Sequence, residues 1–222
     1  MCFSAGASFA ATGATAVAGA AAVNWAKKPS QMLLGAIPLF FAVHQFAEGV
    51  LWVALSNEEH AAWAQPAIST YLIVSKVVWP AWVPLSVLAV EEDPGRRRLL
   101  SALLILGAVL ALAMAYGLNA YPVSANIAGP HVQYRQDSPL PFRWITDIAY
   151  AVAIVLPPLL SSIKLMRFVG LVLLASLIVS KLFFYHYFAS VWCFFAALIS
   201  VMLVVVVRTS QPRAATATAG VP

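Results

Sequence analysis

Long segments of apolar residues, nearly free of charge, run through most of this 222-residue chain. A helix needs about 20 predominantly apolar residues to cross the hydrocarbon core of a bilayer. Only 9% of the residues are charged and the mean hydropathy is +0.87, whereas a soluble domain carries about 25% charged residues. The sequence therefore predicts an all-α, polytopic membrane helix bundle without room for a soluble catalytic domain.

We expect seven transmembrane helices within one domain over residues 1–207. Their predicted limits are 2–25, 31–55, 64–90, 99–118, 144–163, 168–185 and 187–207. An outer loop occupies 119–142, and the Ala- and Thr-rich tail over 208–222 has the composition of a disordered cytosolic segment. Pro80, Pro84, Pro157 and Pro158 lie inside spans, where proline removes a backbone donor and predicts a kink.

Basic residues decide the orientation because Lys and Arg accumulate in cytoplasmic loops near the ends of spans. One side of the predicted bundle receives Lys27, Lys28, Arg96, Arg97, Arg98, Lys164, Arg167, Arg208 and Arg213, and the other receives Arg135 and Arg143. This bias places the N-terminus outside and the C-terminus in the cytosol. Lys27 and Lys28 follow the first apolar segment, whereas a signal peptide carries its positive charge before it. We therefore expect that segment to remain as a span.

The formal net charge of +5 has the same explanation. Most basic residues flank apolar segments, and none form the basic patch interleaved with aromatic residues that nucleic-acid binding favours. We therefore expect the lipid bilayer as a partner, and no nucleic acid.

Four ionisable residues fall within the predicted spans: Glu48, Lys76, Asp147 and Lys181. A charge near the bilayer centre costs about 2.5–3.5 kcal/mol on insertion scales, and such residues mark functional sites by default. Two of the four are acidic and two are basic, so their charges balance. At 1.5 Å of rise per residue, all four lie in the outer half of the membrane once lysine snorkels toward the surface.

The second span adds further polar groups on one helical face, which we expect to turn toward the interior of the bundle. Together with residues near the outer turn between the last two spans, they predict an outer-half polar pocket. Its candidate ligand-binding residues are His44, Gln45, Glu48, Trp52, Lys76, Asp147, Lys181, His186 and Trp192. The competing interpretation is a structural polar core, because buried ion pairs also fix helix register without doing chemistry.

The two cysteines, Cys2 and Cys193, are both predicted near the outer face. An oxidising exterior favours a disulfide between them if their Cα atoms lie within about 7 Å. Alternatively, Cys2 becomes an N-terminal nucleophile after removal of Met1, and Cys193 is a small buried hydrophobe.

Three segments carry a resemblance: Met1 to Ala5 (Met-Cys-Phe-Ser-Ala), Gln45 to Trp52, and Ser190 to Ala197. Together they resemble an uncharacterised family of bacterial multi-pass membrane proteins that begin with Met-Cys-Phe-Ser. The resemblance implies the bacterial plasma (inner) membrane as the location and seven spans as the fold. It implies no activity and assigns no catalytic residue.

A second resemblance is to the seven-span alkaline ceramidases, which hold zinc with three histidines. It implies a zinc site on His44, Glu48 and His186, whose residue types are suitable ligands. The chain departs from that pattern because Ser190 stands four residues after His186, where a last-helix histidine pair requires His. Retinal proteins share the span number, but no lysine occurs between Tyr187 and Val207.

The leading hypothesis is that the pocket binds, senses or translocates a small molecule or ion. The alternatives are an intramembrane metal-dependent lipid hydrolase and a structural or assembly protein, so whether the chain is an enzyme stays open. Gly6, Gly13 and Gly19 would supply a small-residue packing face for assembly. Common phosphate-loop, nucleophile-elbow and His-Glu-x-x-His motifs are absent from the sequence.

Overall fold

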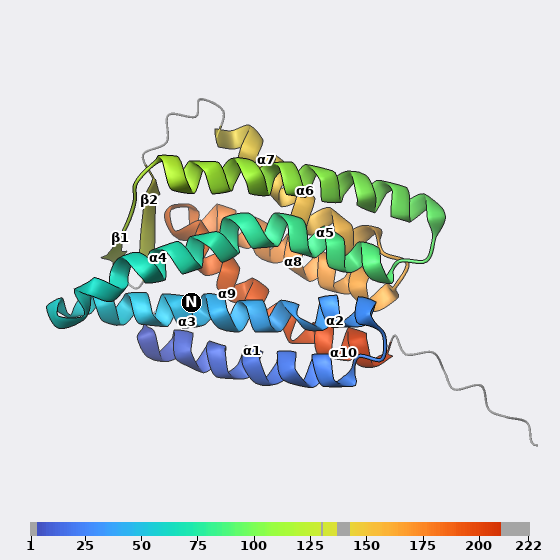
Figure 1. The fold of residues 1–222 in the computed structure, drawn as a ribbon, viewed down its shortest axis with the longest axis horizontal. Coiled ribbons are helices and arrows are strands. Elements are labelled where there is room, and N and C mark those ends of the chain that lie inside the picture. Colours follow the sequence, from blue (N-terminus) through green and yellow to red (C-terminus); the bar gives the residue numbers. More distant parts are fainter. Residues whose placement is uncertain (1–3, 130, 137–142, 210–222) are drawn as a thin grey trace, which may run out of the picture.

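The computed structural model describes residues 4–129, 131–136 and 143–209. Apart from one hairpin, their regular structure is helical and forms a bundle, which confirms the predicted all-α class. Figure 1 shows the chain passing back and forth between two ends of this bundle. The helical elements are α1 (Ala5–Trp25), α2 (Pro29–Gly35), α3 (Ile37–Ser56), η1 (Glu58–Trp63), α4 (Ala64–Leu72), η2 (Ile73–Val78), α5 (Trp79–Val90), α6 (Pro94–Ala120), α7 (Arg143–Leu160), α8 (Lys164–Phe183), η3 (Tyr185–Tyr187), α9 (Phe188–Ser200) and α10 (Met202–Thr209).

Six helical stretches are long and apolar enough to cross a membrane. They are Ala5–Trp25, Pro29–Ser56, Glu58–Val90, Pro94–Ala120, Lys164–Phe183 and Val191–Thr209, and Trp144–Leu160 is a shorter apolar helix. Large apolar side chains such as Val17, Leu112 and Leu182 point outward and are more than 70% exposed. A surface of this kind suggests a membrane-associated protein, because soluble monomers rarely expose large apolar patches to water.

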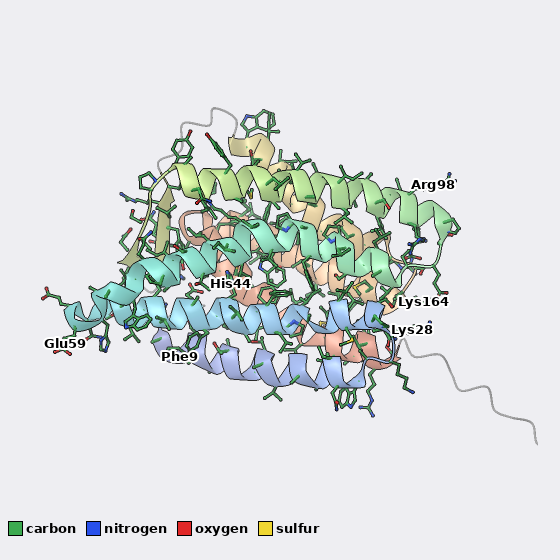
Figure 2. The ribbon with its side chains drawn as sticks, viewed as in Figure 1. Phe9, Lys28, His44, Glu59, Arg98 and Lys164 are labelled. Atoms are coloured by element: carbon green, nitrogen blue, oxygen red, sulfur yellow. The ribbon has the colours of Figure 1, made fainter. Side chains whose placement is uncertain are left out.

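The two ends of the bundle differ in character. Lys28, Arg98 and Lys164 lie together at one end, which we call the basic end, and Glu59 lies at the opposite end (Figure 2). The β-hairpin also lies at that opposite end, which we call the hairpin end. The helix α1 begins near the hairpin end, and α10 finishes at the basic end.

The predicted outer loop contains a hairpin that the sequence analysis did not anticipate. Strands β1 (Val123–Ala128) and β2 (His131–Gln136) pair antiparallel, with Ala125 opposite Tyr134. Gly129 takes a φ of 60° at the turn, a value that glycine adopts without steric cost. Val132 is 1% exposed and packs with Leu51 and Tyr71 of the bundle. The hairpin is therefore anchored onto the helices.

The third predicted span is irregular where it approaches Pro80. Residues Ile73–Val78 form a π segment, with hydrogen bonds from i to i+5 in place of i+4. Pro80 has no N–H to complete such a bond to the Ser75 carbonyl. The Tyr150 hydroxyl of α7 donates to that carbonyl instead. The neighbouring helix thus satisfies the group that the proline frees, whereas α7 itself stays helical through Pro157 and Pro158.

The predicted second and seventh spans are each interrupted, which their sequence patterns did not indicate. The first break separates α2 from α3 at Ala36, and Pro38 occupies the first turn of α3, where no donor is lost. The second separates α9 from α10 at Val201. Of the predicted tail at 208–222, the first two residues complete α10, and the others lie outside the described residues.

Small residues let helices approach closely, as predicted. A Cβ on Gly19 of α1 would lie 2.8 Å from the backbone nitrogen of Leu39, and one on Gly107 of α6 would lie 1.8 Å from the Pro80 carbonyl oxygen. Gly13 has open space around it. The face of α1 that carries Gly19 is therefore used within the chain, against α3.

Candidate ligand-binding site

A cavity of about 210 Å³ lies among η2, α6, the hairpin, α7 and α9. We call it the polar chamber. Its lining includes the charged side chains Lys76, Arg135 and Asp147 and the polar side chains Ser75, Tyr134, Gln136 and Tyr150. Met114, Phe188, Trp192, Cys193, Leu72 and Val123 complete the lining. The chamber brings together three of the predicted pocket residues, Lys76, Asp147 and Trp192.

Lys76 belongs to the π segment and is held by the hairpin. Its ammonium donates to the Gln136 carbonyl oxygen Oε1 at 2.6 Å. The Gln136 amide in turn donates to the Gly117 carbonyl at the end of α6, at 2.9 Å. The amide therefore connects the charged group to two different elements and fixes where the ammonium sits.

Asp147 and Lys181, two of the four charged residues predicted in the outer half of the membrane, form an ion pair. Lys181 Nζ lies 3.2 Å from Asp147 Oδ2, and it also lies 4.3 Å from the centroid of the Phe188 ring. The two side chains are 37% and 62% exposed for Lys181 and Asp147, respectively. Such an exposed pair contributes about 0–1 kcal/mol in water, so it serves chiefly to join α7 to α8 and to occupy the carboxylate.

The polar stripe of the second span faces the interior, as predicted. His44, Gln45 and Glu48 are fully buried on α3, and Trp52 is 8% exposed. Of the six long stretches, the one that carries them is the most enclosed, with 61% of its most apolar window buried compared with 28% for α1. The stripe therefore occupies the centre of the bundle.

Stacked rings connect this stripe to the chamber. The His44 ring lies 4.0 Å from the Tyr71 ring, and the Tyr71 ring lies 4.5 Å from that of Tyr134, which lines the chamber. Both His44 ring nitrogens lack a partner at hydrogen-bonding geometry among the described residues, although the Tyr71 backbone is close. His44, Gln45 and Glu48 thus lie behind the chamber wall and not in its lining.

Cys193 lies at the junction of the stripe and the chamber. Its thiol lies against the Tyr71 side chain, and Glu48 is near enough to act on it electrostatically. Cys193 is a buried thiol with no disulfide partner among the described residues. Cys2 lies outside the described residues, so the disulfide stays a prediction.

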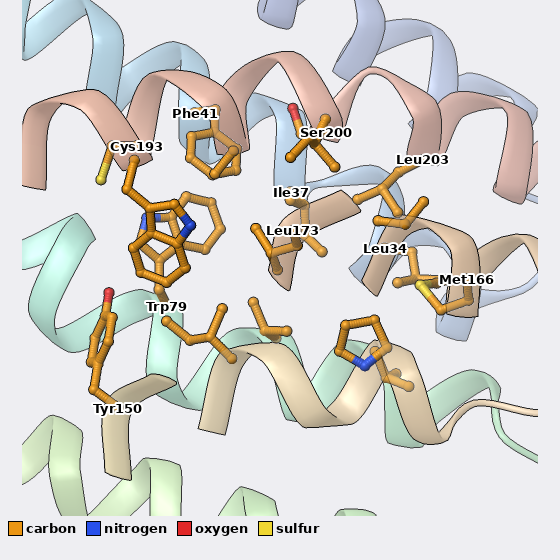
Figure 3. Close-up of a pocket in the computed structure, with 18 residues that line it drawn as sticks. Leu34, Ile37, Phe41, Trp79, Tyr150, Met166, Leu173, Cys193, Ser200 and Leu203 are labelled. Atoms are coloured by element: carbon orange, nitrogen blue, oxygen red, sulfur yellow. The ribbon is translucent and has the colours of Figure 1, made fainter. Parts of the chain in front are cut away.

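A second cavity, of about 70 Å³, is lined mainly by apolar side chains of α2, α3, α5, α7, α8, α9 and α10 (Figure 3). Cys193 and Tyr150 lie at one end of it, and Met166 and Leu203 lie at the other. The Ser200 hydroxyl in its lining donates to the Ala197 carbonyl at 2.6 Å, whereas the indole nitrogens of Trp79 and Trp192 have no hydrogen-bond partner among the described residues. We call it the apolar cavity.

The zinc hypothesis draws on one residue that the structure does not describe in full. The backbone of His186 belongs to η3, but its side chain lies outside the described side chains. Among the described residues, no three or more His, Cys, Asp and Glu side chains are grouped to hold a metal ion. Of the proposed ligand set, the described part supplies only His44 and Glu48.

The sequence analysis missed Tyr71, Tyr134, Arg135, Gln136 and Tyr150 as site residues. Tyr150 follows Asp147 by three positions and so shares its helical face. This spacing could have identified Tyr150 as a site residue from the sequence. The hairpin residues gave no such signal, because their approach to η2 depends on the folded position of the whole loop.

The described residues form a bundle of long apolar helices with a small charged chamber, an arrangement compatible with a membrane protein. The chain belongs to the family of unknown function DUF6629, whose model matches residues 1–219. This agrees with the uncharacterised family indicated by its sequence motifs. No curated protein and no solved structure matches the chain.

Proposed function

We propose that the chain is a seven-span protein of the bacterial plasma membrane whose polar chamber binds a small, negatively charged molecule. In this proposal the shorter helix Trp144–Leu160 also crosses the membrane and adds a span to the six long stretches. The basic end faces the cytosol, because basic residues accumulate there, and the hairpin end faces outside. Binding would be the first step of sensing or of transport.

The observation that carries the proposal is free volume beside charged groups. A purely structural ion cluster would be packed as tightly as the rest of a protein interior. Here Lys76, Arg135 and Asp147 border a cavity of about 210 Å³. Charged groups next to space that fits a small molecule are typical of a binding site.

The charges favour an anion. Two of the three charged residues in the lining are cations, and the Asp147 carboxylate is already bonded to Lys181. If the neighbouring Lys181 and the buried Glu48 are counted with these three residues, there are three cations and two anions. The Lys76 ammonium is positioned by Gln136 and carries three donors, so it is able to contact a ligand as well.

The first prediction tests this site by calorimetry on protein in lipid nanodiscs, with acetate, inorganic phosphate and methylammonium as probes. We expect an anion to bind and methylammonium not to bind. Lys76→Met should lower the anion affinity about 10- to 100-fold, the value of one hydrogen bond to a charged group. Lys27→Met, at the exposed basic end, is the matched control and should leave the affinity unchanged.

Failure of every anion to bind the wild-type protein would refute the proposal, as would equal binding by the Lys76 variant. Elemental analysis of the same sample tests the lipid-hydrolase alternative. Stoichiometric zinc that is lost in His44→Ala would favour the hydrolase over the binding protein.

A further inference from the structure

Three residues line both cavities: Tyr150, Trp192 and Cys193. We call this shared wall the partition. Trp192 stacks on Phe188 with ring centroids 5.3 Å apart and meets Tyr150 edge-on at 6.1 Å. The polar chamber and the apolar cavity therefore adjoin at these side chains.

The same element positions the charged group and the partition. The π segment carries Lys76, and its Ser75 carbonyl accepts the Tyr150 hydroxyl. A π segment inside an α-helix is uncommon and is frequently found at functional sites. Movement of the lysine on binding a ligand would therefore move the anchor of Tyr150.

The two cavities differ in the polarity of their linings, so they favour different parts of a ligand. The chamber offers Lys76 and Arg135, whereas the apolar cavity is lined mainly by residues such as Leu34, Ile37 and Leu173. An apolar cavity remains dry and accepts hydrocarbon readily. A ligand that occupied both would need a charged group joined to an alkyl chain.

We infer that the ligand is an aliphatic carboxylate, whose head binds beside Lys76 in the polar chamber and whose tail passes the partition into the apolar cavity. This inference rests on the proposed function and names the ligand class of that site. Binding is non-covalent. The Lys76 ammonium donates to the carboxylate, while Tyr150 and Trp192 turn aside to admit the tail.

The test is calorimetry with acetate, butanoate, hexanoate and octanoate on protein in nanodiscs, corrected with protein-free nanodiscs. Each buried methylene should tighten binding about fourfold until the tail fills the cavity. Ala196 lines the apolar cavity and not the polar chamber, so Ala196→Leu should flatten this rise while leaving acetate affinity unchanged. Ala102→Leu, on the exposed face of α6, is the matched control and should keep the rise.

The outcomes distinguish failure of the proposed function from failure of the aliphatic-carboxylate inference. If no carboxylate binds, the proposed function fails and this inference fails with it. If acetate and hexanoate bind equally, or if Ala196→Leu keeps the full rise, the chamber still binds anions and the inference alone is overturned. If affinity continues to increase with chain length up to hexadecanoate, the tail lies in the bilayer and the inference is also overturned. Tight binding of hexylamine would overturn the carboxylate head.

Discussion

At the scale of single residues, a charged side chain within an apolar segment can be recognised from the sequence. The close contacts between residues that are far apart in the chain cannot. Glu48, Lys76, Asp147 and Lys181 stood out from the sequence because each is costly in lipid. The roles of Gln136 and Tyr150 did not stand out, because amides and tyrosines are ordinary at membrane interfaces. Their importance depends on partners that are 60 and 75 positions away.

Gly107 shows how much a single missing side chain matters. A Cβ there would lie 1.8 Å from the Pro80 carbonyl oxygen, which belongs to a backbone that cannot rotate away. We expect Gly107→Ala to lower the free energy of unfolding by about 1–3 kcal/mol or more. Denaturant titration in detergent micelles would measure it.

The matched control is Gly13→Ala on α1, where nothing lies within 4 Å of the added atom. That change should be neutral or stabilise the protein by about 0.5–1 kcal/mol, since alanine is the better helix former. Equal destabilisation by both substitutions would contradict the packing of α6 against α5.

At the scale of elements, the helical periods and lengths predicted most of the architecture, and irregular segments escaped prediction. The limits of the first, fourth and fifth spans agree with α1, α6 and α7 to within a few residues. The pattern of apolar residues did not indicate the π segment or the breaks at Ala36 and Val201. The hairpin was missed because its strands are short and partly polar.

The π segment makes a prediction about coupling between Pro80 and Tyr150. Tyr150→Phe leaves the Ser75 carbonyl without its donor and should cost about 1–3 kcal/mol. Pro80→Ala restores an N–H that is able to bond within the helix, so the same Tyr150 change should cost less in that background. A double-mutant cycle on unfolding free energies measures the difference. Strictly additive costs would show that the proline does not create the need for the hydroxyl.

Glu91 joins four helices at the basic end. Its carboxylate accepts from the Ser162 backbone N–H at 2.6 Å and from those of Asp93 and Glu92 at 3.1 and 3.2 Å, which ties the α5–α6 connection to the α7–α8 connection. Burial by itself would raise the pKa of this carboxyl, but the hydrogen bonds outweigh it and hold the pKa below its usual 4.5.

A depressed pKa stabilises the folded protein above the unfolded value of 4.5, and that stability is lost as pH falls through the folded value. Glu91→Gln should therefore cost about 1 kcal/mol at pH 7, the difference between charged and neutral hydrogen bonds. The gap to wild type should close below pH 4.5. Glu92→Gln, at an exposed neighbour, is the control in the same pH series and should show no such gap.

At the scale of the whole molecule, the distribution of charge between the two ends predicts orientation. Lys28, Arg98 and Lys164 share one end of the bundle, as the sequence indicated before their spatial positions were known. We expect alkaline phosphatase fused after Asn57 or Ala128 to be active outside, and green fluorescent protein fused after Glu92 or Ser162 to fluoresce inside. The reverse pattern at any of these connections would contradict seven spans in this orientation.

The polar chamber takes its walls from segments that are distant in sequence, from η2 near the middle of the chain to α9 close to its end. During synthesis, Lys76 and the hairpin emerge from the ribosome well before Trp192 and Cys193. The site therefore does not exist until α9 has joined the bundle. A chain stopped before α9 would lack the side of the chamber that Trp192 and Cys193 supply, and Lys76 and Asp147 would then line an incomplete site.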